Sequence, residues 1–401
     1  MFTPPVTLAG LWPPAAAVAI RPDDDALDWL SPSLAWRERI TAIPVPLAGG
    51  LPVVCHEAGS TPAALQLLRH CGLPADAPVL RYGTPEERRA HLAALGAGGR
   101  KIGAIYGARR AQLPAEAHVN HPDTVAALND KANLAELLPP ECLPARTVVA
   151  GAGLAAALEA RRGALPLVLK AASPLGSAGG LDVSICRTSD DFGSACRKLA
   201  RAERVVIEEY CAFETTWCLH YAASDAGVAF VGATEQVCDA AGAYLGNWRE
   251  EGSGPGGEAV ELGWAAALAG WVRGYRGFIG IDAGRTANGR WLAFDPNFRL
   301  NGSTLQALVG AAIADAWGTP CTRMVNGVAF EGSFDRMLER LAAFHDRHEL
   351  LPTLLFDGPR LGLANGDGSP ACNLLVAGVD RAAVADVFRA LRVEGFRAPA
   401  A

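Results

Sequence analysis

The stretch that most constrains the fold of this chain is residues 277–304, GFIGIDAGRTANGRWLAFDPNFRLNGST. Two mostly apolar runs, Phe278–Asp282 and Trp291–Phe294, lie on either side of Asn288-Gly289. An Asn-Gly pair between apolar runs is the strongest short-range sequence signal for a β-hairpin. We therefore expect two antiparallel strands joined by a two-residue turn.

The expected register brings two carboxylates together. A two-residue turn puts Asp282 directly opposite Asp295, with their Cβ atoms roughly 5 Å apart on one face. Facing carboxylates repel unless one is protonated or a cation lies between them. Side-chain alternation adds Asn297 and Arg299 to the same face. Carboxylate and amide oxygens suit Mg²⁺, and an arginine binds phosphate or carboxylate groups. The alternative is a plain hairpin with surface aspartates.

Length and composition exclude several classes of protein. A chain of 401 residues predicts two or three domains. The net charge of −6, without a lysine/arginine run, gives a nucleic-acid partner no electrostatic support. The ten cysteines have no metal-ligand spacing and indicate reduced thiols. No apolar run reaches the ~18 residues of a membrane span, and no signal peptide is indicated. We expect a cytoplasmic protein that acts on small molecules.

Residues 1–120 predict a small α/β domain with a parallel sheet, because short strand-like runs alternate with helical patterns. The strand-like runs are residues 51–56, 78–83 and 101–106. Helices are expected at Pro62–His70 and after Thr84, where threonine, proline and Glu87 form a capping box.

Two lysines and a glycine-rich segment follow. Lys131 lies in a predicted helix, Pro122–Leu138, and Lys170 ends a predicted strand. Residues 171–180 hold three glycines and two serines, a composition that lets backbone N–H groups approach phosphates; a glycine-rich hairpin tip is the alternative. Residues 151–156 have the shape of a dinucleotide fingerprint but lack its acidic ribose partner, so we interpret them as a tight turn.

The next segment carries acidic residues at the end of a strand. Residues 204–211 (RVVIEEYC) form a predicted strand, and Glu214 follows it. Residues 242–258 are rich in glycine and long enough to be a loop that acts as a substrate lid. The C-terminal residues alternate short strands and helices, which predicts a small α/β appendage with strands that include residues 362–364.

The order of these features resembles the ATP-grasp superfamily over roughly residues 121–305. In that family two α+β subdomains grip ATP, and a pre-ATP-grasp α/β domain typically precedes them. The resemblance implies four parts: a pre-ATP-grasp domain (1–120), a subdomain with the lysines and glycine-rich loop (121–205), a subdomain with the adenine segment and metal site (206–320), and the appendage (321–401).

The resemblance also implies ATP and Mg²⁺ as cofactors, with Mn²⁺ as a substitute. The implied phosphate contacts are Lys131 and Lys170, with a closing loop that contains Ser173, Gly176, Ser177, Gly179 and Gly180. The implied adenine and ribose contacts are Glu208, Glu209, Tyr210, Cys211 and Glu214. The implied metal ligands are Asp282, Asp295 and Asn297, and the implied catalytic residues are Arg299 and Asn301. Asp295 departs from the family, which usually has Glu there.

Family members mostly phosphorylate a carboxylate with ATP and let an amine attack the acyl-phosphate. We therefore expect an ADP-forming ligase that makes an amide or peptide bond between small molecules such as amino acids or a peptide. The alternatives are a kinase on the same fold, or a catalytically inactive nucleotide-binding regulatory protein, whose only sequence support is Asp295. Because ATP-grasp ligases are often dimers, the resemblance also suggests a homodimer.

Overall fold

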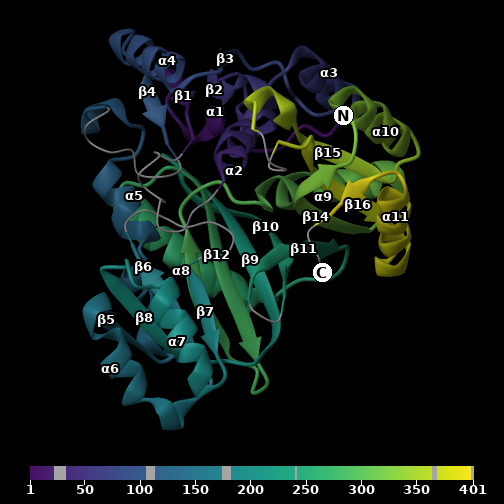
Figure 1. The fold of residues 1–401 in the computed structure, drawn as a ribbon. Coiled ribbons are helices and arrows are strands. Elements are labelled where there is room, and N and C mark those ends of the chain that lie inside the picture. Colours follow the sequence, from purple (N-terminus) through teal and green to yellow (C-terminus); the bar gives the residue numbers. More distant parts are fainter. Residues whose placement is uncertain (22–32, 105–112, 174–181, 240–241, 364–367, 399–401) are drawn as a thin grey trace.

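The computed structural model describes residues 1–21, 33–104, 113–173, 182–239, 242–363 and 368–398. Within these residues the strands form three sheets: a parallel sheet near the N-terminus, a small antiparallel sheet and a large antiparallel sheet (Figure 1).

The N-terminal sheet has four parallel strands in the order β3-β2-β1-β4, which confirms the predicted parallel sheet. The strands are β1 (Ala16–Val18), β2 (Val53–His56), β3 (Val79–Tyr82) and β4 (Lys101–Gly103). The helices are α1 (Leu8–Leu11), α2 (Leu34–Arg39), α3 (Pro62–His70) and α4 (Pro85–Ala97). The predicted capping box begins α4, with Thr84 Oγ1 accepting from Glu87 N at 3.2 Å.

The small antiparallel sheet has the order β5-β8-β6-β7. Its strands are β5 (Arg146–Ala150), β8 (Arg204–Glu209), β6 (Leu167–Ala172) and β7 (Val183–Cys186), and its helices are α6 (Leu154–Glu159) and α7 (Ser189–Lys198). Thr188 caps α7, and Asp191 completes a capping box with it. The turn before α6 is a short 3-10 helix, Gly151–Gly153.

The predicted helix Pro122–Leu138 is broken at Asp130. Helix α5 covers Pro122–Asn129, and the 3-10 helix η6 covers Lys131–Glu136. Asp130 has an extended backbone, and its carboxylate accepts from the N–H of Ala132 at 2.9 Å. An aspartate that caps a new helix start competes with continuation of the previous helix. Lys131 is therefore the first residue of η6 instead of a mid-helix position.

The large antiparallel sheet has the order β13-β12-β9-β10-β11-β14-β16-β15, with β17 paired to β14. Its strands are β9 (Phe213–Ser224), β10 (Gly227–Cys238), β11 (Tyr244–Glu250), β12 (Gly277–Thr286), β13 (Trp291–Asn297), β14 (Cys321–Phe330), β15 (Leu350–Phe356), β16 (Ala371–Gly378) and β17 (Phe396–Arg397). Its helices are α8 (Gly257–Val272), α9 (Thr304–Trp317), α10 (Phe334–Asp346) and α11 (Arg381–Val393). The strands of the predicted C-terminal appendage thus extend the sheet that contains the hairpin.

Two predictions on loops and strands were wrong. Residues 242–258 are not one lid loop: Tyr244–Glu250 is strand β11, paired with β10 on one side and β14 on the other. The strand expected at residues 362–364 is also wrong for the two residues of that stretch that the structure describes, 362 and 363. The 3-10 helix Gly358–Leu361 ends at Gly362, and the left-handed backbone of Gly362, with a φ of +64°, is not that of a strand.

The hairpin confirms the facing aspartates by a different route from the predicted one. Thr286 pairs with Arg290, so the turn has three residues, and Gly289 takes a positive φ of +84°. That turn shifts the register by one residue, and a bulge at Phe294 shifts it back. Asp282 consequently pairs with Asp295, and Gly280 with Asn297, as expected. The β-bulge was not visible in the sequence pattern.

One hydrophobic core joins the beginning and the end of the chain. It contains Leu47 and Leu68 of the N-terminal part together with Leu351 and Leu374 of the large sheet, all nearly inaccessible to solvent. Helix α3 packs against β15 and α10, and Figure 1 shows these three elements side by side. The N-terminal part therefore covers one region of the large sheet, while the small sheet lies at the opposite end of the view.

Candidate active site

The N-terminal part, the small sheet and the large sheet all contribute to one cavity of about 650 Å³. The predicted site residues among those that line it are Lys131, Lys170, Glu208, Glu209, Tyr210, Cys211, Asp282, Asp295, Asn297, Arg299 and Asn301. Residues that lie far apart in the sequence, on η6, β6, β8, β12 and β13, thus meet at a single site.

The facing carboxylates form the part of the cavity that could hold a metal ion. Asp282 and Asn297 are buried, and the Asn297 Nδ2 group donates to Asp282 Oδ2 at 3.3 Å. Asp282 Oδ1 is buried without a hydrogen-bond partner among the described residues. Burial, and then the charge of Asp295, raise the pKa of Asp282. A divalent cation would supply the missing positive charge, and carboxylate and amide oxygens are the ligands that Mg²⁺ accepts. These residues therefore fit Mg²⁺.

No group of three or more His, Cys, Asp or Glu side chains suited to a metal ion occurs in the described part of the chain. Asp282, Asp295 and Asn297 include only two side chains of those four types. Mg²⁺ normally keeps several waters and is bound by one or two carboxylates plus substrate phosphates. Two carboxylates and an amide oxygen are thus a donor set of the size that Mg²⁺ accepts.

Lys131 lies between two carboxylates at the same end of the cavity. Its Nζ donates to Asp182 Oδ2 at 2.7 Å and is 3.4 Å from Asp295 Oδ1. Both carboxylates are thus within ion-pair distance of the same ammonium group. Burial alone would lower the pKa of Lys131, but Asp182 and Asp295 outweigh it and raise the pKa. The lysine is therefore charged and held beside the facing aspartates.

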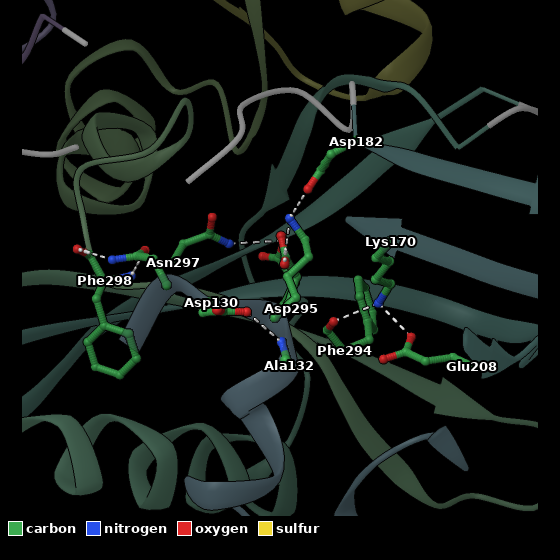
Figure 2. A network of polar contacts seen from close by, with 12 residues as sticks. Asp130, Ala132, Lys170, Asp182, Glu208, Phe294, Asp295, Asn297 and Phe298 are labelled. Carbon is green, nitrogen blue, oxygen red and sulfur yellow. Dashed lines mark hydrogen bonds and ion pairs between the residues drawn. The ribbon is translucent and has the colours of Figure 1, made fainter. Parts of the chain in front are cut away.

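Lys170 belongs to a second buried network. Its Nζ is 2.6 Å from Glu208 Oε2 and donates to the carbonyl oxygen of Phe294 at 2.7 Å (Figure 2). Glu208 is also 3.4 Å from the guanidinium of Arg146, which donates to the carbonyl oxygen of Lys131. Burial lowers the pKa of Arg146, and Glu208 opposes that shift. One carboxylate thus compensates two buried cations and links both lysines.

The predicted adenine segment lies at the edge of this network. Glu209, Tyr210 and Cys211 line the cavity together with Phe213, whose ring stacks on Phe294 at 5.4 Å between centroids. Glu214 is not brought to the cavity: half of its side chain is exposed, and it lies 3.7 Å from Arg285. Ser173 ends the described stretch before the glycine-rich loop, and the remaining loop predictions, Gly176, Ser177, Gly179 and Gly180, lie outside the described residues.

The residues after β13 continue the site. Arg299 Nη1 donates to Asn129 Oδ1 at 3.0 Å, and Asn301 Nδ2 donates to Cys218 Sγ at 3.2 Å. A Cβ atom on Gly280 would lie only 2.3 Å from Asn301 Nδ2. The glycine in β12 therefore leaves the space that the Asn301 amide occupies.

Comparison of the sequence with known families gives two matches. The family described as L-aspartate–L-methionine ligase, ATP grasp, matches residues 144–297, and the family described as L-aspartate–L-methionine ligase N-terminal domain matches residues 7–126. Together the matches cover about two thirds of the chain. The chain belongs to the ATP-grasp superfamily. As a member of its carboxylate–amine ligase type, it forms amide or peptide bonds on small substrates with ATP, which confirms the predicted reaction class.

Solved structures share the fold of this ATP-grasp ligase. N5-carboxyaminoimidazole ribonucleotide synthetase from Thermus thermophilus aligns with a TM-score of 0.58 at 14% identity, over 90% of this chain and 98% of that one. L-amino acid ligase from Bacillus licheniformis aligns with a TM-score of 0.55 at 14% identity, over 89% and 94%. Carboxyaminoimidazole ribonucleotide synthase from Aspergillus clavatus, complexed with ATP, aligns with a TM-score of 0.55 at 13% identity, over 84% and 96%.

Two residues that contact the predicted lysines of the ligase were missed from the sequence. Asp182 holds Lys131, and Arg146 connects Glu208 to the backbone of Lys131. Asp182 carried a usable signal, because it is the first acidic residue after the glycine-rich loop and directly precedes β7. Arg146 carried none, since a single arginine at the start of a strand normally faces solvent.

The ligase has no helix, within the described residues, with the length and apolar character that crossing a membrane requires.

Proposed function

We propose that this ligase uses Mg²⁺-ATP to phosphorylate a substrate carboxylate and then joins the acyl group to an amine. The γ-phosphoryl group passes to a carboxylate oxygen and ADP leaves. The amine nitrogen then attacks the acyl carbon, the carbon–oxygen bond to phosphate breaks, and inorganic phosphate leaves. The observation that carries the proposal is the single cavity that contains both lysines, the facing aspartates and Arg299. Phosphoryl transfer depends mainly on positioning and charge neutralisation, which these groups supply.

In this proposal each group has a separate task. Lys131 and Lys170 bind ATP phosphates, together with the loop that begins at Ser173. Asp282, Asp295 and Asn297 hold Mg²⁺, for which Mn²⁺ can substitute because it accepts the same oxygen ligands. The buried Asp282 Oδ1, which has no hydrogen-bond partner in the described part of the chain, supports this assignment.

Arg299 contacts the transferred phosphoryl group, and Asn301 lies next to it on the acceptor side. The adenine base lies along Glu208, Glu209, Tyr210 and Cys211, and the stacked rings of Phe213 and Phe294 border that space. Glu214 binds the ribose. Its side chain is half-exposed and lies 3.7 Å from Arg285, so it must turn toward the cavity to do so.

The family description supports an acidic and an apolar amino acid as the substrates. Both matching families carry the name L-aspartate–L-methionine ligase. We therefore assign L-aspartate as the amino acid whose carboxylate is activated and L-methionine as the amine, which gives a dipeptide with a free methionine carboxylate.

The test is a coupled assay of ADP and phosphate release with purified protein. Release is expected to require an acid and an amine together, and to fall at least about a hundredfold when either is omitted. Hydroxylamine should trap the acyl-phosphate as a hydroxamate. Formation of AMP and pyrophosphate, or a stable phosphorylated product without an amine, would overturn the proposal.

We also propose a cytoplasmic homodimer. All ten cysteines are free thiols, which is typical of a reducing compartment, and ATP-grasp ligases are often dimers. Light scattering coupled to size-exclusion chromatography tests the dimer, with a mass of one 41.8 kDa chain as the contrary result.

A further inference from the structure

Strands β14 and β15 each carry an irregularity at the same row of the large sheet, on either side of β16, and this row borders the cavity. On β14, Asn326 and Gly327 together oppose Asn373 of β16. On β15, the register against β16 shifts beside the same residue, where Thr353 is the extra residue. Asn326, Leu354 and Asn373 all line the cavity. Bulges redirect side chains and are common beside active sites, so this row is a candidate for a binding role.

The bulge presents an unused hydrogen-bond acceptor. Asn326 Nδ2 lies within hydrogen-bonding distance of the Gly302 carbonyl oxygen, at 3.4 Å, while Asn326 Oδ1 is buried and has no partner among the residues that the structure describes. Gly302 directly follows Asn301, and a Cβ atom on Gly302 would lie 2.5 Å from Asn326 Nδ2. The row therefore connects directly to the predicted catalytic segment. A buried acceptor without a partner is costly, which indicates that a ligand N–H group completes it.

A cation from the N-terminal part lies over the same bulge. Gly327 has a φ of +73°, and a Cβ atom there would lie 2.9 Å from Nη2 of Arg39. Arg39 is the last residue of α2 and lines the cavity. The glycine thus allows the guanidinium group to lie close to the β14 backbone.

The remaining surface of this end is apolar. Trp36, Ile40 and Ile43 line it from the N-terminal part. Leu300, which follows β13, and Leu354 of β15 also line it. A pocket with an apolar wall and a few placed polar groups is typical of a small-molecule subsite.

We propose that these residues, the bulge subsite, bind the acceptor amino acid: Arg39 binds its α-carboxylate, Asn326 Oδ1 accepts an N–H of its amine, and the apolar wall takes its side chain. This inference rests on the proposed function. The bulge subsite holds the acceptor carboxylate at Arg39, away from the proposed phosphate-binding lysines. This carboxylate is therefore not positioned to be phosphorylated. After the ammonium group loses a proton to solvent, its nitrogen attacks the acyl-phosphate. The carbon–nitrogen bond forms, phosphate leaves, and the phosphate takes the second proton.

The test compares L-methionine with L-methioninamide, which lacks the α-carboxylate, as acceptors at saturating ATP and L-aspartate. The wild-type protein should prefer methionine about 10- to 100-fold in kcat/KM, the range of one charge-assisted interaction. Arg39→Gln should reduce this preference to about threefold or less. Without the guanidinium group, the α-carboxylate of methionine has no ion pair that methioninamide lacks. Arg37→Gln is the matched control, since Arg37 lies on the same helix but is not among the described residues that line the cavity. It should keep the wild-type preference.

A second variant keeps the inference testable if Arg39→Gln does not fold. Ile43→Ala removes part of the apolar wall and enlarges the pocket. The preference for phenylalanine over methionine in kcat/KM should therefore rise about tenfold. An unchanged methionine-to-methioninamide ratio in folded Arg39→Gln overturns the subsite, as does an unchanged side-chain preference in Ile43→Ala. If the wild-type protein releases ADP without any amine, the proposed function itself fails. If it needs an amine but does not distinguish methionine from its amide, only the subsite fails.

Discussion

The Glu208 network allows a prediction of stability that can be worked from distances. Glu208 is 2% exposed and lies 2.6 Å from Lys170 and 3.4 Å from Arg146, whose side chains are 6% and 9% exposed. Glu208→Gln keeps the size and one acceptor oxygen but removes the negative charge that both cations contact. Breaking a buried ion pair by neutralising one partner costs about 3–5 kcal/mol. Because the glutamine oxygen can still accept from Lys170, we expect the lower end, about 3 kcal/mol of unfolding free energy.

Urea unfolding followed by tryptophan fluorescence and by circular dichroism measures this loss. Glu209→Gln is the control, because Glu209 is the next residue on β8 but is exposed, and its carboxylate accepts from Ala145 N at 2.9 Å. That variant should change the unfolding free energy by at most about 1 kcal/mol.

ATP provides an independent check of the same reasoning. In the proposed function the nucleotide phosphates bring negative charge to Lys170. Saturating Mg²⁺-ATP should then stabilise Glu208→Gln more than it stabilises the wild-type protein. If Glu208→Gln and Glu209→Gln lose equal stability, Glu208 does not carry the charge compensation described above and the reasoning fails.

Two further substitutions test the rest of the site, and a third, at the buried His220 of β9, tests the surrounding fold. Asp282→Asn should lower ADP release by about a hundredfold or more, because it removes a proposed metal ligand. Since burial and Asp295 raise the pKa of Asp282, its ionised form destabilises the fold, so in metal-free buffer this variant should unfold at higher urea than wild type at pH 8 but not at pH 4. Burial lowers the pKa of His220 to about 3 from 6.5, so wild-type stability should fall as pH drops below 6.5, and His220→Gln should flatten that dependence in urea titrations; parallel curves would contradict it. Gly280→Ala should push away the Asn301 amide and reduce kcat by about a hundredfold, and full activity would show that the amide position does not matter.

The parts of the site that the sequence predicted are those fixed by local rules. Side-chain alternation and the Asn-Gly hairpin signal predicted Asp282 opposite Asp295, which is the observed pairing. The capping box at Thr84, outside the site, likewise depends on neighbouring residues only. Even there, the agreement at the hairpin came from two offsetting differences, a longer turn and a bulge at Phe294. Local patterns constrain which residues share a face better than they constrain turn length.

The parts that the sequence missed depend on contacts between distant residues. Strand β11 contains Gly246, which favoured a loop interpretation. In the fold, a Cβ atom at Gly246 would lie 2.0 Å from the Met324 carbonyl oxygen, so this glycine permits the close pairing of β11 with β14. Asp182 and Arg39 line the cavity because separate sheets pack together there. No periodicity within one element encodes such contacts.

The shared core of the first and last parts of the chain has a consequence for how the protein is made. Leu47 and Leu68 bury their surfaces in the same cluster as Leu351 and Leu374, so contacts across roughly three hundred residues complete it. Chains dominated by such distant contacts fold slowly, because loop closure must precede any gain from burial. The N-terminal part emerges first during synthesis but finds its apolar partners only after the last strands have been translated. We therefore expect a nascent chain halted near residue 320 to be protease-sensitive and to depend on chaperones, although it would already contain every proposed ATP contact.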